Sequence, residues 1–203
     1  MTKIKICGLS RPCDIEYVNE AKPDFCGFII NVPKSKRNVS PDTVRQLVKN
    51  LSPDVKPVGV FVNAPMDEIA ALAEDGTLAY VQLHGKEDEA YIAALREKIH
   101  VPIIQAFKVT CPEDVAHAQQ SSADYILLDN GSGGTGKTFD WSHLQGITRP
   151  YILAGGLGPD NLAQAVSQLA PWGVDLSSGV ETDGFKDKDK VLAAVQAVRT
   201  TLY

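Results

Sequence analysis

Eight short apolar segments recur along the chain, and segments with helical signals separate them. The apolar segments are rich in Val, Ile, Leu, Phe and Tyr and do not alternate with polar residues, which is typical of strands buried on both faces of a parallel sheet. They are Ile4–Cys7, Phe25–Ile30, Pro57–Val62, Ala79–Leu83, Pro102–Phe107, Tyr125–Leu128, Tyr151–Ala154 and Val174–Leu176. Between them, a capping Ser40 precedes Pro41, and apolar residues at helical spacing follow Pro159 and Lys190. The alternation predicts an α/β fold with right-handed crossovers.

The number of these units favours a closed barrel. The chain has 203 residues, so each unit has about 25 residues, and (β/α)₈ barrels typically need about 250 residues but occur down to about 200. An open doubly wound sheet of this length would have fewer strands and longer helices. No linker, low-complexity segment or shift in composition marks a second domain. We therefore expect one (β/α)₈ TIM barrel domain over residues 1–203.

Composition argues against several functional classes. A net charge of −5 is opposite to the basic surface that binds nucleic acid. The four cysteines show no C-x-x-C spacing, which argues against a zinc site or a thioredoxin-like motif. No apolar segment has the length of a membrane span, and the chain enters its first predicted strand without a signal peptide. We expect a protein of the reducing cytoplasm with free thiols.

Polar residues and glycines gather where the predicted strands end. In a barrel the catalytic residues lie at the C-terminal ends of the strands, so closure would bring these residues around one opening. They are Cys7, Gln82, His84, Asp129, Gly155, Gly156, Asp175, Ser177, Ser178 and Gly179.

The last two strand ends suggest a phosphate site. Gly155-Gly156 and Ser177–Gly179 offer unobstructed backbone N–H groups, and barrels often hold phosphate on the loops after strands seven and eight with a short extra helix. The residues after Gly179 could form that helix. The other reading is that these glycines only make tight turns, but two such loops on consecutive strands favour phosphate.

Four side chains, three of them at the ends of predicted strands, each allow a structural and a functional interpretation. Cys7 is either an inert buried thiol or a reactive one. Asp129 directly follows Ile126–Leu128 and either caps a loop or, partly desolvated, donates a proton. His84 is either a structural residue at a strand end or part of the site. Arg37 belongs to the basic cluster Lys34–Arg37 and is either solvated or pairs with a substrate carboxylate.

One segment fits a different class of protein. Gly131 to Thr138 matches the phosphate-binding pattern G-x-x-x-x-G-K-[ST], which predicts a nucleotide-binding protein. A true P-loop leads into a sizeable helix, whereas Gly146 and Pro150 leave room here for about two helical turns after Thr138. We favour a mobile loop over a substrate between Asp129 and a short helix starting at Phe139–Trp141. Lys137 either neutralises charge near the opening or is solvated.

Taken in order, nine motifs resemble those of the phosphoribosylanthranilate isomerases, enzymes of tryptophan biosynthesis. The motifs are Lys5–Gly8, Gly27–Ile29, Ser35–Arg37, Val58–Phe61, Val81–Gly85, Leu127–Asp129, Gly133–Trp141, Leu153–Leu157 and Gly173–Glu181. The resemblance covers nearly the whole chain and implies a (β/α)₈ barrel of the ribulose-phosphate-binding type.

The resemblance also implies a reaction and a set of roles. The reaction is the Amadori rearrangement of N-(5′-phosphoribosyl)anthranilate to 1-(2-carboxyphenylamino)-1-deoxyribulose 5-phosphate, without a metal or cofactor. Cys7 would be the general base, Asp129 the general acid and Arg37 the ligand of the anthranilate carboxylate. The phosphate would bind the glycine and serine loops of the last two strands. Gln82, His84 and Asp175 would complete the substrate site.

Three alternatives remain beside this resemblance. They are the P-loop protein, a barrel that binds a phosphate ligand without catalysis, and a sister enzyme acting on histidine- or indole-pathway phosphosugars. The presence of both Cys7 and Asp129 speaks against loss of catalysis. We expect a small phosphosugar as the partner, with neither nucleic acid nor membrane, in a monomer or homodimer.

Overall fold

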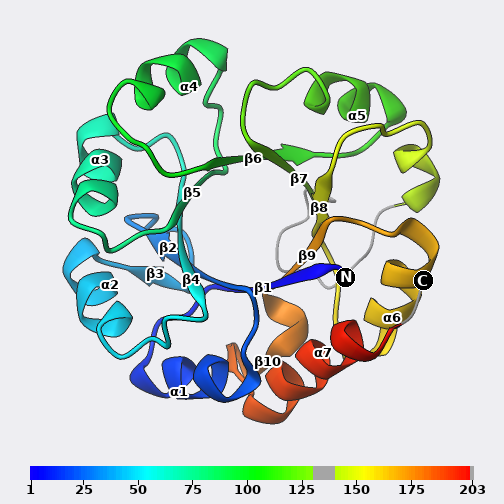
Figure 1. The fold of residues 1–203 in the computed structure, drawn as a ribbon, viewed down its shortest axis with the longest axis horizontal. Helices are drawn as coiled ribbons and strands as arrows, with labels where there is room; N and C mark the ends of the chain where they lie inside the picture. Colours follow the sequence, from blue (N-terminus) through cyan, green and yellow to red (C-terminus); the bar gives the residue numbers. More distant parts are fainter. Residues whose placement is uncertain (130–139, 202–203) are drawn as a thin grey trace.

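Eight parallel strands form a closed barrel in the computed structural model, which describes residues 1–129 and 140–201 (Figure 1). The barrel strands are β1 (Lys3–Cys7), β2 (Phe25–Ile30), β4 (Lys56–Phe61), β5 (Tyr80–Leu83), β6 (Ile103–Lys108), β7 (Tyr125–Asp129), β8 (Tyr151–Leu153) and β9 (Gly173–Leu176). The ring closes because β1 pairs with both β2 and β9. The predicted barrel is therefore confirmed, and each end of the eight strands lies within one residue of its expected position.

Helices surround the barrel and connect its strands (Figure 1). They are α1 (Pro12–Ala21), α2 (Pro41–Val48), α3 (Met66–Glu74), α4 (Glu89–Arg96), α5 (Pro112–Ala118), α6 (Pro159–Leu169) and α7 (Lys188–Thr200). As the sequence predicts, Ser40 caps α2 by accepting a hydrogen bond from the backbone N–H of Thr43. A two-residue strand, β3 (Asn38–Val39), pairs with β2 before α2 begins. In the described part of the chain, no helix is long and apolar enough to cross a membrane.

The sixth unit differs from the others after its strand. The P-loop-like segment Gly131–Thr138, which includes Lys137, lies outside the described residues. The expected motion of this loop therefore stays a prediction. When the described chain resumes it forms η1 (Trp141–Leu144), a single 3₁₀ turn capped by Asp140. This short helix follows the predicted start, and it is much shorter than the helix that a nucleotide-binding P-loop requires.

The interior of the barrel is packed at its N-terminal end. Phe25 and Tyr80 meet edge to face at 5.1 Å between ring centroids, and Tyr125 and Trp172 lie 4.4 Å apart. Above these rings lie the aliphatic side chains of Val58, Ile104, Leu127 and Ile152. Because this end is filled, the open space inside the barrel lies towards the C-terminal ends of the strands.

A hairpin follows the last barrel strand, in place of the helix expected after Gly179. The 3₁₀ turn η2 (Ser178–Val180) already includes Gly179, and the chain then forms antiparallel β10 (Glu181–Thr182) and β11 (Phe185–Lys186). Asp183 and Gly184 join them with φ of +52° and +83°. A turn with two positive φ values suits a two-residue hairpin, and Asp-Gly is a preferred sequence for it. The hairpin places Glu181 and Lys186 opposite each other.

Candidate active site

A cavity of about 170 Å³ opens at the C-terminal ends of the barrel strands. The structure brings together on its wall all the predicted site residues except Gly179. They are Cys7, Arg37, Gln82, His84, Asp129, Gly155, Gly156, Asp175, Ser177 and Ser178. Apolar side chains of Ile29, Val60 and Leu157 complete the lining. A mixture of apolar surface and a few converging polar groups is typical of a small-molecule site.

Cys7 ends β1 inside the cavity, beside a buried lysine. A Cβ atom on Gly27 would lie 2.7 Å from the Cys7 Sγ and 3.1 Å from the Lys5 Nζ, so the glycine of the neighbouring strand leaves room for both groups. Burial raises the pKa of the Cys7 thiol above its ordinary value, and the positive charge of Lys5 opposes this shift. Burial therefore favours the protonated thiol, and a nearby positive charge on a ligand would favour the thiolate.

Lys5 itself is held by Asp175. Its Nζ donates to both carboxylate oxygens of Asp175 at 3.0 Å each. The two residues are direct partners in the register of β1 and β9. Burial lowers the pKa of Lys5, but the attraction of Asp175 and Cys7 outweighs burial and keeps this pKa above its ordinary value. A charged ammonium group thus lies against Asp175, which lines the cavity.

Asp129 ends β7 and faces His84, the residue that directly follows β5. The His84 Nε2 lies 3.7 Å from the Asp129 Oδ2, and the Gln82 Nε2 lies 3.0 Å from the His84 Nδ1. With the Gln82 amide donating, Nδ1 accepts and the proton resides on Nε2, towards Asp129. Desolvation lowers the pKa of His84, which favours this neutral ring.

One carboxylate oxygen of Asp129 has no partner within the described part of the chain. Its Oδ1 is buried and has no hydrogen-bond partner among the described residues. An unpaired buried polar atom costs about 1–3 kcal/mol, a cost that a bound ligand with a suitable oxygen or proton would remove. The arrangement suits proton exchange with a ligand in the cavity.

Two glycine-containing turns border the cavity beside α6. Gly155 and Gly156 have φ of +87° and +66°, values that other residues adopt at a cost. Their N–H groups donate to no described residue. Gly179 lies behind this turn, because a Cβ atom there would be 2.0 Å from the backbone oxygen of Leu157. The two loops are thus in backbone contact, as a shared anion site requires.

Arg37 reaches the cavity from the segment after β2, and its guanidinium is paired with a carboxylate. Its Nε and Nη2 each donate to a carboxylate oxygen of Glu181 at 2.6 Å. Arg37 was predicted in the site from the sequence, but its partner Glu181 was not. Glu181 was visible only as the last residue of the Gly173–Glu181 motif.

Known proteins match nearly the whole chain, including all the strands that surround this cavity. Residues 4–197 match the family described as PRAI, N-(5′-phosphoribosyl)anthranilate (PRA) isomerase. The N-(5′-phosphoribosyl)anthranilate isomerase of Endomicrobium trichonymphae is 45% identical over 98% of this chain and 100% of its own length.

The chain belongs to the N-(5′-phosphoribosyl)anthranilate isomerase family.

Solved structures of phosphoribosylanthranilate isomerases share this fold. One of them, in complex with reduced 1-(o-carboxyphenylamino)-1-deoxyribulose 5-phosphate, has a TM-score of 0.86 and 35% identity over 98% of this chain and 99% of its own. Another, from Thermotoga maritima, is described as monomers generated from a dimeric enzyme and matches with the same TM-score, identity and coverage. Members of this family are isomerases of tryptophan biosynthesis, and the resemblance drawn from the sequence motifs is confirmed.

The structure adds three residues that sequence reasoning did not place in this phosphoribosylanthranilate isomerase site. Lys5 appeared in the sequence only as the first residue of the Lys5–Gly8 motif, because it lies within an otherwise apolar strand. Lys186 and Glu181 belong to the unpredicted hairpin. The Asp183-Gly184 pair was a usable signal for that hairpin, since Asp-Gly is a preferred two-residue turn between antiparallel strands.

Proposed function

We propose that this protein catalyses the rearrangement of N-(5′-phosphoribosyl)anthranilate to 1-(2-carboxyphenylamino)-1-deoxyribulose 5-phosphate, in tryptophan biosynthesis. The observation that carries the proposal is that Cys7 and Asp129, from strands β1 and β7 that are not neighbours in the ring, line one cavity. Family membership supports the substrate. Two groups that exchange protons on different sides of a ligand are what an aldose-to-ketose isomerisation needs.

In the proposed mechanism, Asp129 acts first as a general acid. It donates a proton to the ribose ring oxygen, the C1′–O bond breaks, and the nitrogen lone pair forms an iminium ion. The free Oδ1 of Asp129 is a suitable donor position once protonated. His84, with its Nε2 proton towards the other oxygen, would keep the carboxyl group oriented.

Cys7 then acts as the general base. The iminium charge acidifies the proton on C2′, and the Cys7 thiolate removes it to give an enolamine, which tautomerises to the ketone. Burial alone keeps Cys7 protonated, but Lys5 and the iminium ion both favour the thiolate. The reaction thus needs a proton on Asp129 and none on Cys7 at the same time, and the positive charge of Lys5 beside Cys7 favours that state of the thiol. Neither step needs a metal or a cofactor.

The remaining site residues would bind the two ends of the substrate. We propose that the N–H groups of Gly155 and Gly156, with Ser177, Ser178 and Gly179, hold the phosphate. Arg37 would bind the anthranilate carboxylate. Gln82 and Asp175 would act through His84 and Lys5. A location in the cytoplasm, a monomeric or dimeric state and a single domain over residues 1–203 remain predictions.

A fluorescence assay tests this function directly. Phosphoribosylanthranilate is generated in situ, and its consumption is followed after addition of the protein. We expect turnover by the unaltered protein and a large loss in Cys7→Ala and Asp129→Asn. Absence of turnover in the unaltered protein, together with tight Mg-ATP binding, would favour the nucleotide-binding alternative.

A further inference from the structure

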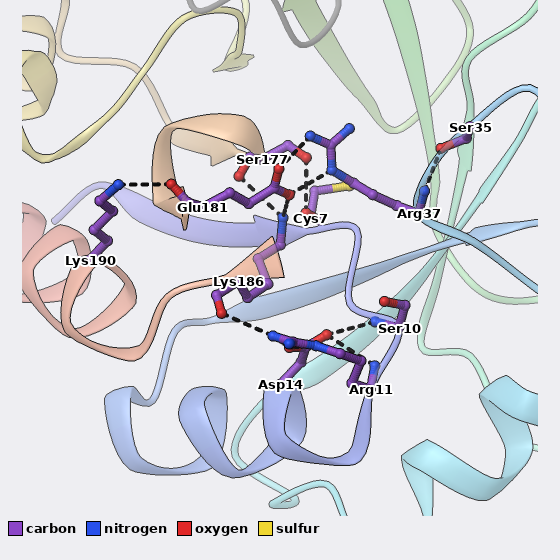
Figure 2. Close-up of polar contacts among 10 residues, drawn as sticks. All are labelled: Cys7, Ser10, Arg11, Asp14, Ser35, Arg37, Ser177, Glu181, Lys186 and Lys190. Atoms are coloured by element: carbon purple, nitrogen blue, oxygen red, sulfur yellow. Dashed lines mark hydrogen bonds and ion pairs between the residues drawn. The ribbon is translucent and has the colours of Figure 1, made fainter. Parts of the chain in front are cut away.

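The guanidinium of Arg37 is held along one edge by a buried carboxylate (Figure 2). The Nε and Nη2 of Arg37 bond to the two oxygens of Glu181. The Glu181 side chain is only 6% exposed, so this pair is not a solvated surface contact. A bidentate bond of this kind fixes both the position and the plane of the guanidinium.

This contact leaves the outer edge of the guanidinium for a ligand. Arginine has five N–H donors, and Glu181 uses the ones on Nε and one side of Nη2. No described residue accepts from the Nη1 of Arg37, while Arg37 lines the cavity. The Nη1–Nη2 edge can therefore take a second carboxylate in the same bidentate geometry.

A second cation balances the charge of Glu181. The Nζ of Lys186 contacts the Glu181 carboxylate and donates to the backbone oxygen of Ser177 at 3.1 Å. The Lys186 side chain is 2% exposed. An isolated Arg37–Glu181 pair would be neutral and would attract an anion weakly, but with Lys186 the three groups carry a net charge of about +1. The group thus remains attractive to a carboxylate.

The hairpin that carries these two residues is fixed to its surroundings. Arg11, itself paired with Asp14, donates to the backbone oxygen of Lys186 at 3.0 Å. Lys190 donates to the backbone oxygen of Glu181 at 2.8 Å, and both contacts are visible in Figure 2. Anchors on α1 and α7 give Glu181 a fixed place from which it can orient Arg37.

From these contacts we infer that Glu181 and Lys186 are positioning residues for Arg37 and determine specificity for a carboxylate on the aromatic ring of the substrate. The inference rests on the proposed function. Glu181 sets the direction of the guanidinium, and Lys186 keeps the group cationic. Neither residue needs to touch the substrate.

Equilibrium binding of two ligands tests the inference. The first ligand is reduced 1-(o-carboxyphenylamino)-1-deoxyribulose 5-phosphate, and the second is the same compound without the ring carboxylate. Glu181→Gln and Lys186→Met should each weaken binding of the first ligand about tenfold or more, the loss expected for a misplaced charge-assisted hydrogen bond. Binding of the second should change less than about twofold. Lys188→Met, an exposed lysine of the same segment, should leave both unchanged.

The outcomes separate this inference from the proposed function. Retained binding of the second ligand shows that the variant is folded with an intact phosphate site. Equal weakening of both ligands would mean that the pair only supports the phosphate loop, and it would overturn the inference, as would unchanged binding of both. If the unaltered protein binds the two ligands equally well, the carboxylate is not recognised and the proposed role of Arg37 fails as well. In turnover, Glu181→Gln should raise KM with little change in kcat.

Discussion

Within the barrel, the ammonium group of Lys5 lies 3.0 Å from each carboxylate oxygen of Asp175, with side chains only 2% and 9% exposed. Asp175 lines the cavity together with Cys7, and Lys5 lies against both side chains. Two functions follow for it, one in stability and one in the reactivity of the thiol.

Removal of one partner should destabilise the fold more than removal of both. Lys5→Met leaves Asp175 buried without its cation, and breaking a buried ion pair costs about 3–5 kcal/mol. In the double variant Lys5→Met/Asp175→Asn, no charge remains uncompensated, so its loss should be smaller than that of Lys5→Met or Asp175→Asn alone, and well below their sum. Urea unfolding of the four proteins measures this coupling. Additive losses would show that the two side chains do not interact energetically.

The reactivity of Cys7 should depend steeply on pH. Burial raises the pKa of its thiol above the ordinary 9.0, so the thiolate is a minor species at neutral pH and its fraction grows as pH rises. Without added substrate, the rate of alkylation of Cys7 by iodoacetamide should increase about tenfold per pH unit between pH 7 and 9. Mass spectrometry of the Cys7 peptide measures the rate. A plateau below pH 8 would contradict the raised pKa, and Lys5→Met should slow the reaction at every pH.

The acid and base should each be required for turnover. Cys7→Ala removes the proton acceptor and Asp129→Asn removes an ionisable proton donor, so kcat should fall about 10²–10⁴-fold in each. The matched controls Cys13→Ala and Asp54→Asn replace residues away from the cavity and should retain activity. The fluorescence assay measures kcat, and circular dichroism checks the fold. Near-normal turnover in either site variant would refute the assigned roles.

Arg37 should act on substrate binding more than on chemistry. Arg37→Ala removes the proposed ligand of the anthranilate carboxylate and leaves Cys7 and Asp129 in place. KM should therefore rise about tenfold to a hundredfold, as for loss of a charge-assisted bond, with a smaller effect on kcat. Steady-state kinetics measures both. With a substrate that lacks the carboxylate, the two proteins should have similar KM values; an equally large rise in KM for that substrate would show that Arg37 does not act through the carboxylate.

The strands and the opening could be predicted because both depend on local pattern and on a general property of the fold. Apolar segments without alternation gave strand positions such as Phe25–Ile30, which the structure has unchanged. The C-terminal ends of barrel strands then located residues such as Asp129 at the cavity.

The charged partners could not be predicted in this way, since they depend on long-range contacts. Lys5 meets Asp175 only because the ring closes between β1 and β9. Arg37 meets Glu181 over 144 positions of sequence, through a hairpin whose strands are two residues each. Such short strands carry no periodicity, so the Asp183-Gly184 turn was their only local signal.

Contact between the two phosphate loops should tolerate no side chain at Gly179. A Cβ atom there would lie 2.0 Å from the Leu157 oxygen and 3.0 Å from the Gly158 Cα. Both neighbours are backbone, so Gly179→Ala must push the loops apart and misplace the N–H groups proposed to bind phosphate. Inhibition by inorganic phosphate should weaken at least about tenfold. Gly173→Ala is the matched control, because its Cβ would meet neighbours at an ordinary 3.5 Å. Equal phosphate inhibition in the two variants would contradict a phosphate site at this junction.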